Sequence, residues 1–189
     1  MAKKLSNSAS DRNYGIVAAV SAELLSHVNK SEMTRIRQES RYDDRLYGYR
    51  DVVTRASSAC FRGLHGMVYY FDGRCWVSFD KDFVLLKASI TSALVSLNVP
   101  KGDVVKSELR LLQAARDGAS MSPLEQSPCV IGFYNGVWDF SDISNPVRHD
   151  FSERMPITSV LSYPYLPGEK CPLWCSFLSK ILKPRDIEV

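Results

Sequence analysis

Acidic residues in the last third of the chain are the first candidates for metal chemistry. Asp139, Asp142 and Asp150 lie close together in the sequence, and His149 precedes the last of them. Metal-dependent nucleases and polymerases need carboxylates that converge on their metal ions. Aspartates in a polar segment more often form turns and caps. We interpret these residues as turn formers and predict no catalytic residue and no metal ligand; a metal-dependent nuclease or primase is the alternative.

The five cysteines are scattered, and only Cys171 and Cys175 lie near each other. A zinc site needs further cysteine or histidine ligands at short spacing, and no second pair is present. We therefore interpret the cysteines as buried thiols in a reducing compartment. No apolar run approaches the roughly 20 residues that span a bilayer, so we expect a cytoplasmic protein with no membrane partner.

Aromatic and basic residues are the candidates for nucleic-acid binding. Aromatic rings stack on bases, and cations contact phosphates. The net charge of +3 permits such contacts without requiring them. The default alternative is that the rings pack inside a sheet and the cations lie on solvated helix surface. The candidates are Arg62, Tyr69, Arg74, Trp76, Lys101, Lys106, Arg110, Lys180 and Lys183.

Common motifs of nucleotide-binding and metal-dependent enzymes are missing. The sequence has no G-x-x-x-x-G-K-[ST], no G-x-G-x-x-G and no H-E-x-x-H. These motifs supply the phosphate-binding loops and the zinc ligands of large enzyme classes. We therefore expect no cofactor in this chain.

Residues 1–60 are predicted to form a flexible tail and a helical N-terminal segment. Residues 1–13 are polar, whereas apolar residues in 14–28 recur at helical spacing. Residues 31–51 carry charges of both signs without a sustained apolar stripe, so an exposed helix and a linker both fit. Asp51 is expected to cap a short helix that ends near Phe61.

Residues 61–189 are predicted to form a second unit that contains two β-hairpins. The first hairpin, 67–79, turns at Asp72-Gly73, and the second turns at Asn135-Gly136. Asn-Gly favours a two-residue type I′ turn, which needs positive φ at both central positions. A two-stranded ribbon cannot bury the aromatic residues of the first hairpin alone, so it must pack on a helix or join a larger sheet.

Two helices are expected between the hairpins. Asp82 is predicted to cap a helix that runs to Asn98. Asp103 is predicted to cap the next helix, which Asp117-Gly118 would end, because glycine commonly follows the last helical residue.

A strand and a helix are expected after the second hairpin. Residues 157–163 alternate partly, as in a strand, and residues 172–183 read as a helix with Pro172 in its first turn. The predicted fold class is α+β, with helices packed on antiparallel hairpins that are either separate or joined in one mixed sheet.

The order of these segments resembles a known replication family. The run I-G-F-Y-N-G-V-W-D-F is followed by R-H-D, then T-S-V-L-S-Y-P-Y, then C-P-L-W-C-S-F-L. This order is similar to the helicase-associated module that precedes the superfamily 3 ATPase domain in phage, plasmid and poxvirus-type primase–helicases. The upstream run Y-Y-F-D-G-R-C-W resembles the hairpin that opens the module. The resemblance covers residues 67–189.

The resemblance implies a role in DNA replication. The resemblance implies that the parent protein is an ATP-dependent DNA helicase of a virus, phage or plasmid, often with an upstream primase domain. It further implies that this helicase forms a homo-oligomeric ring on DNA in the host cytoplasm. ATP and Mg²⁺ would bind the ATPase domain, and we expect this chain to end before it. The resemblance predicts a non-catalytic collar or adaptor that positions DNA or neighbouring subunits. A stand-alone single-stranded nucleic-acid-binding domain and a pure oligomerisation domain are the alternatives.

Overall fold

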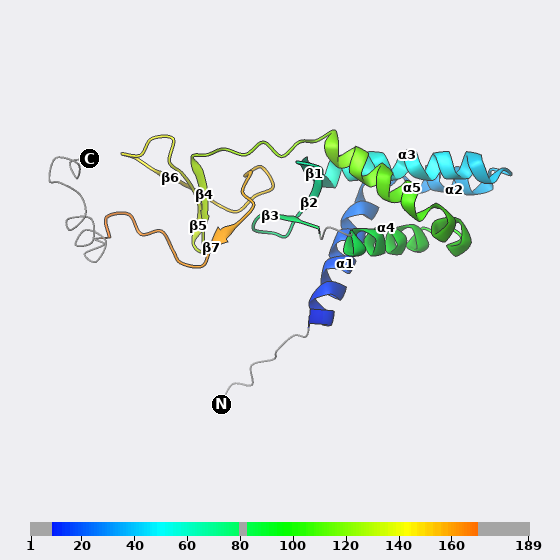
Figure 1. Ribbon diagram of the computed structural model, residues 1–189, viewed down its shortest axis with the longest axis horizontal. Helices are drawn as coiled ribbons and strands as arrows, with labels where there is room; N and C mark the ends of the chain where they lie inside the picture. The colour runs from blue at the N-terminus through cyan, green and yellow to red at the C-terminus, as the bar shows by residue number, and fades with distance from the viewer. Residues whose placement is uncertain (1–8, 80–82, 170–189) are drawn as a thin grey trace, which may run out of the picture.

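The chain has the α+β fold that its sequence predicts. The computed structural model describes residues 9–79 and 83–169. Five helices and a three-stranded antiparallel sheet form one part of the molecule, and a four-stranded mixed sheet forms the other (Figure 1). The two hairpins therefore belong to separate sheets, and a single mixed sheet does not form.

The first helix starts earlier than predicted. α1 spans Ala9–Ser26, so residues 9–13 are helical and do not belong to a tail. Its buried side chains include Val20 and Leu24, at i and i+4 on one face. This face packs along α4, Val84–Ser96. The packing against α4 stabilises the helix.

The charged segment forms helices and contributes to the core. α2 spans Lys30–Gln38, and α3 spans Tyr42–Cys60. Met33, Ile36 and Tyr49 are 1%, 5% and 1% exposed. The segment therefore has a narrow apolar stripe, which is hard to recognise in the sequence because charged residues surround it.

The predicted helix cap at Asp51 is wrong. Asp51 lies exposed inside α3. The residue that precedes α3 is Arg41, which makes no side-chain capping hydrogen bond. The buried residues Val52, Val53 and Ala56 continue the face that Tyr49 begins, so one long helix replaces a linker and a short helix.

The first sheet contains a strand that the sequence did not predict. β1, Phe61–Leu64, pairs antiparallel with β2, Met67–Phe71. His65 and Gly66 connect them with φ of 50° and 77°, the positive values that a two-residue type I′ turn needs. Gly63, in β1, and Gly66, in the turn, thus belong to a tight hairpin.

The predicted hairpin at Asp72 is confirmed. β2 pairs with β3, Trp76–Ser78, and Phe71 is opposite Trp76. The Asp72 carboxylate accepts hydrogen bonds from the backbone N–H groups of Arg74 and Cys75, at 2.8 and 2.9 Å. This local turn is typical of aspartate.

The two helices between the hairpins are α4 and α5. The predicted cap Asp82 lies outside the described residues. α5 spans Lys101–Ser120, so Asp103 lies inside the first turn and does not precede the helix. Asp103 instead pairs with Arg45, with Nε and Oδ2 3.1 Å apart.

Gly118 does not end α5, contrary to the prediction. The helix continues past Gly118, where it packs against α3. A Cβ on Gly118 would be 2.9 Å from the Cβ of Ser57 and still closer to the carbonyl oxygen of Thr54. The glycine therefore allows a close helix–helix approach.

The second sheet has the strand order β6-β5-β4-β7. The strands are β4, Val130–Phe133; β5, Gly136–Asp139; β6, Val147–His149; and β7, Val160–Leu161. β7 lies within the predicted strand and pairs parallel with β4. The parallel pair makes this sheet mixed.

The second hairpin is confirmed, but its turn is shifted by one residue. Phe133 pairs with Gly136, so Tyr134 and Asn135 are the central residues. Among these residues only Gly136 has a positive φ, 140°, so the turn is not of type I′. The Asn135 side chain holds the backbone of Tyr165, accepting from its N–H at 3.0 Å and donating to its carbonyl at 2.8 Å.

The β2–β3 hairpin joins the two parts. Trp76 donates its backbone N–H to the carbonyl of Ile157 at 2.8 Å. Cys75 and Ile157 pack with the fully buried Val137 of the second sheet. These residues form a small second hydrophobic core, to which the loop between β2 and β3 contributes Cys75.

No helix among the described residues has the length and apolar character needed to cross a bilayer. The helix predicted over 172–183, with Cys171, Cys175, Lys180 and Lys183, falls in the part of the chain outside the described residues.

Candidate nucleic-acid interface

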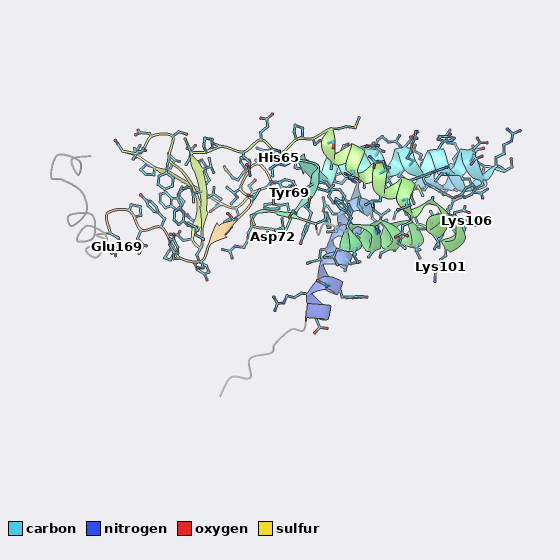
Figure 2. The ribbon with its side chains drawn as sticks, in the orientation of Figure 1. His65, Tyr69, Asp72, Lys101, Lys106 and Glu169 are labelled. Atoms are coloured by element: carbon cyan, nitrogen blue, oxygen red, sulfur yellow. The ribbon has the colours of Figure 1, made fainter. Side chains whose placement is uncertain are left out.

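The structure separates the predicted nucleic-acid-binding residues into two groups. Arg62, Tyr69 and Trp76 come together on the first sheet, with Arg74 in the adjoining loop. The second group lies on α5. Figure 2 labels Tyr69 on the sheet and Lys101 and Lys106 at the far end of the helical part. The two groups are distinct surfaces.

The sheet group is a cation stacked on a buried ring. Arg62 and Tyr69 are opposite each other on β1 and β2, so their side chains share one face of the sheet. The Arg62 guanidinium carbon lies 4.9 Å from the centre of the Trp76 ring. Within this distance a guanidinium is attracted to the ring face. Arg62 and Tyr69 are both partly exposed.

Trp76 is the buried member of this group. It is 1% exposed, and its indole N–H donates to the carbonyl of Glu153 at 3.2 Å. Its ring is therefore held in the core and is not open to a base. Trp76 therefore follows the alternative expectation that the aromatic rings pack inside a sheet, whereas Arg62 and Tyr69 keep accessible surface.

Arg74 connects the two parts of the molecule. Its guanidinium carbon lies 5.5 Å from the Tyr134 ring centre and 4.9 Å from that of Phe151. It also donates to the carbonyl of Tyr134 at 3.2 Å. These contacts give Arg74 a structural role at the junction.

The α5 group combines cations with exposed apolar residues. Lys101, Lys106 and Arg110 are exposed, and so are Val105 and Leu109, at 71% and 74%. Val105 and Leu109 are four residues apart, so they lie on the same helix face. The sequence alone does not reveal this surface, because helical spacing cannot tell which apolar residues a neighbouring element covers.

Two of the three carboxylates considered as metal ligands serve local turns, and the third pairs with a nearby arginine. Asp139 accepts hydrogen bonds from the backbone N–H and hydroxyl of Ser141, at 2.8 and 2.6 Å, and these bonds lower the pKa of Asp139. Asp142 accepts from the backbone N–H of Ser144 at 3.0 Å, and Asp150 lies 3.5 Å from a nitrogen of Arg148. The described residues include no group of three possible metal ligands.

A cavity of about 490 Å³ lies between α1 and β2. Ile16, Val20, Tyr70 and Phe71 are among its apolar lining residues. Sequence reasoning missed this cavity because its walls come from segments far apart in the chain. No local pattern could have revealed it.

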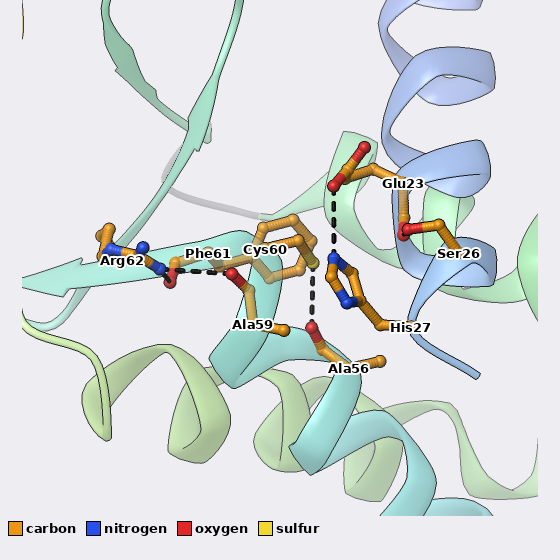
Figure 3. Close-up of polar contacts among 8 residues, drawn as sticks. All are labelled: Glu23, Ser26, His27, Ala56, Ala59, Cys60, Phe61 and Arg62. Carbon is orange, nitrogen blue, oxygen red and sulfur yellow. Dashed lines mark hydrogen bonds and ion pairs between the residues drawn. The ribbon is translucent and has the colours of Figure 1, made fainter. Parts of the chain in front are cut away.

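The charged residues of this cavity are mostly acidic. Glu23, Asp72 and Glu153 line it, and Arg12 is the cation among its described lining residues. Glu23 pairs with His27 at 3.3 Å (Figure 3). The cavity is therefore a mainly apolar site whose charged lining residues are more often acidic than basic.

Cys60 also lines the cavity but is not poised to react. Its thiol donates to the carbonyl of Ala56 at 3.0 Å (Figure 3). Burial raises the pKa of Cys60 to about 12. The thiolate is the nucleophilic form, so this thiol is inert at neutral pH.

The comparisons with known proteins give one result. Residues 58–183, two thirds of the chain, match a family model described as D5 N terminal like. The matched range begins near the end of α3 and includes both sheets, α4 and α5. No curated protein and no solved structure is significantly similar to the chain.

Proposed function

Since the chain belongs to the D5 N-terminal-like family, the module that precedes the superfamily 3 ATPase domain in poxvirus D5-type and phage primase–helicases, we propose that it is a non-catalytic collar or adaptor of a replicative DNA helicase. In this role it positions DNA or neighbouring subunits for unwinding. ATP and Mg²⁺ act in the ATPase domain, and this chain supplies surfaces.

The observation that carries the DNA-binding part of the proposal is the stack of Arg62 on Trp76 beside Tyr69. A guanidinium plane and a phenol ring are the groups on which unpaired bases stack. Trp76 fixes the guanidinium from one side at 4.9 Å. The opposite side of the guanidinium and the exposed part of the Tyr69 ring are then available to a base of single-stranded DNA.

The backbone contacts of Arg62 support this role. One guanidinium nitrogen donates to the carbonyl of Phe61 at 2.8 Å and lies 3.4 Å from that of Ala59 (Figure 3). The side chain is therefore ordered before DNA binds, and less conformational entropy is lost on binding.

Fluorescence anisotropy with a labelled single-stranded oligonucleotide tests the DNA-binding part. We expect Tyr69→Ala to weaken binding about tenfold, because stacking on one aromatic ring contributes roughly 1–3 kcal/mol per base. Arg62→Ala should weaken binding and lower the salt slope by about 1 if the guanidinium also contacts a phosphate. Arg35, exposed on α2, is the matched control. Equal effects of Arg62→Ala and Arg35→Ala would contradict the assignment.

Incubation of the purified chain with Mg²⁺ and ATP tests the non-catalytic part. We expect no phosphate release above that of a heat-inactivated sample. Robust hydrolysis that copurifies with the chain and disappears in a destabilised variant would refute a purely adaptor role.

A further inference from the structure

We infer that copies of this chain associate head to tail, with the exposed face of α5 in one copy docked in the cavity beside α1 of the next. The inference deepens the proposed function, on which it rests, by naming the contact between neighbouring subunits. It follows from two complementary surfaces on one chain.

The first surface is the α5 face that contains Val105 and Leu109. Both side chains are more than two-thirds exposed, and large apolar groups contribute nothing to phosphate binding. Two apolar residues at i and i+4, flanked by charges, are typical of a helix that lies in a groove of a partner. This face therefore fits a protein surface better than a DNA backbone.

The charge of the α5 face is positive. Lys101, Lys106 and Arg110 are exposed around the apolar pair. Of the two acidic residues in this stretch, Asp103 is occupied by Arg45 at 3.1 Å, and Glu108 is exposed. A partner surface that complements this face is therefore apolar and acidic.

The second surface is the cavity between α1 and β2, which has these properties. Its volume of about 490 Å³ is enough for several side chains. Most of its lining residues are apolar, and the charged ones are three acidic residues, Glu23, Asp72 and Glu153, and one cation, Arg12. Gly15 and Ala19 keep the α1 wall low, and nothing lies within 4 Å of a Cβ placed on Gly15, so a helix can approach closely.

One chain cannot join its own two surfaces. Figure 2 places Asp72, at the cavity, and Lys101 and Lys106, on α5, at separate positions, with the helices between them. A contact between different surfaces of identical copies is heterologous, and such contacts generate rings when the rotation closes. The occupant of the cavity is therefore a second copy of this chain.

Complementation of two blocked variants tests the inference. Leu109→Glu removes an apolar contact and adds a charge that the carboxylates repel. Ala19→Arg fills the cavity and repels the cations of α5. We expect the wild-type chain to self-associate as its concentration rises in sedimentation velocity, and each variant alone to stay at the monomer mass. An equimolar mixture should give a species of twice that mass, since each variant keeps one intact surface.

The control is Ala22→Arg, on an exposed position of α1 that does not line the cavity; it should behave as the wild type. Far-UV circular dichroism checks that all variants fold. A wild-type chain that stays monomeric, variants that keep the wild-type mass, or a mixture that stays monomeric would each overturn the inference.

The same samples distinguish this inference from the proposed function. If Leu109→Glu weakens binding of single-stranded DNA and leaves the mass unchanged, α5 is a nucleic-acid surface and the inference fails. If the chain does not self-associate while its DNA binding still depends on Arg62, the inferred subunit contact is refuted and the proposed DNA-binding role stands.

Discussion

Replacement of Gly118 by alanine tests the close contact between α3 and α5. The new methyl group would lie 2.9 Å from the Cβ of Ser57 and 3.1 Å from the backbone nitrogen of Ser58, and closer still to the carbonyl oxygen of Thr54. Two of these three atoms belong to the backbone of α3, so no side-chain rotation relieves the clash. α3 and α5 must separate.

The size of the effect follows from two opposing contributions. Overpacking a well-packed contact costs typically 1–3 kcal/mol, and more when backbone must move. Alanine in place of glycine inside a helix contributes about 0.8–1.0 kcal/mol of stability. We therefore expect a net loss of roughly 2 kcal/mol in the free energy of unfolding. For a chain of this length that corresponds to a decrease of about 4–8 °C in Tm.

Gly102→Ala is the matched control in the same helix. Nothing lies within 4 Å of a Cβ at that position, so the substitution should be neutral or stabilising by up to about 1 kcal/mol. Urea unfolding followed by circular dichroism at 222 nm measures both variants. If Gly118→Ala is as stable as Gly102→Ala, the close approach of α3 and α5 is wrong.

Three further predictions concern single side chains. The folded pKa of Cys60 is about 12, above its ordinary value of 9.0, so unfolding releases a proton in alkaline solution; stability should fall between about pH 9 and 12 by up to about 1.4 kcal/mol per pH unit. Cys60→Ser, which keeps a donor for the carbonyl of Ala56, should reduce this dependence in urea titrations; an unchanged dependence would contradict the prediction. Asn135→Ala removes two hydrogen bonds to Tyr165, each contributing about 0.5–1.5 kcal/mol, so limited proteolysis should cut residues 163–168 faster; an unchanged rate would contradict the clamp. Arg74→Gln removes a cation between two rings and should lower Tm by a few degrees, since an exposed pair of this kind contributes about 0.5–1 kcal/mol; no change in Tm would show that the two parts are held without it.

Local patterns were sufficient where a segment's structure depends on its own residues. Apolar spacing predicted α1, two helices were expected where α4 and α5 lie, and the Asp72 carboxylate defines its turn through hydrogen bonds within three residues. β1 was missed because its pairing with β2 depends on a turn whose first central residue is histidine at φ 50°, which few sequence patterns indicate. The extent of α3 was missed because a single buried stripe is diluted by charges.

The order of the hairpins and the segments that follow them led from the sequence alone to the family, because turn signals and aromatic spacing are written in consecutive residues. Tertiary structure alone decided the exact turns and surfaces. Gly118 lies inside α5, where α3 comes close to it, and the second hairpin turns at Tyr134-Asn135, where the Asn135 side chain bonds to the backbone of Tyr165. The exposed Val105 and Leu109 and the cavity beside α1 also depend on which elements meet. Burial and close approach are properties of pairs of segments, so no single segment encodes them.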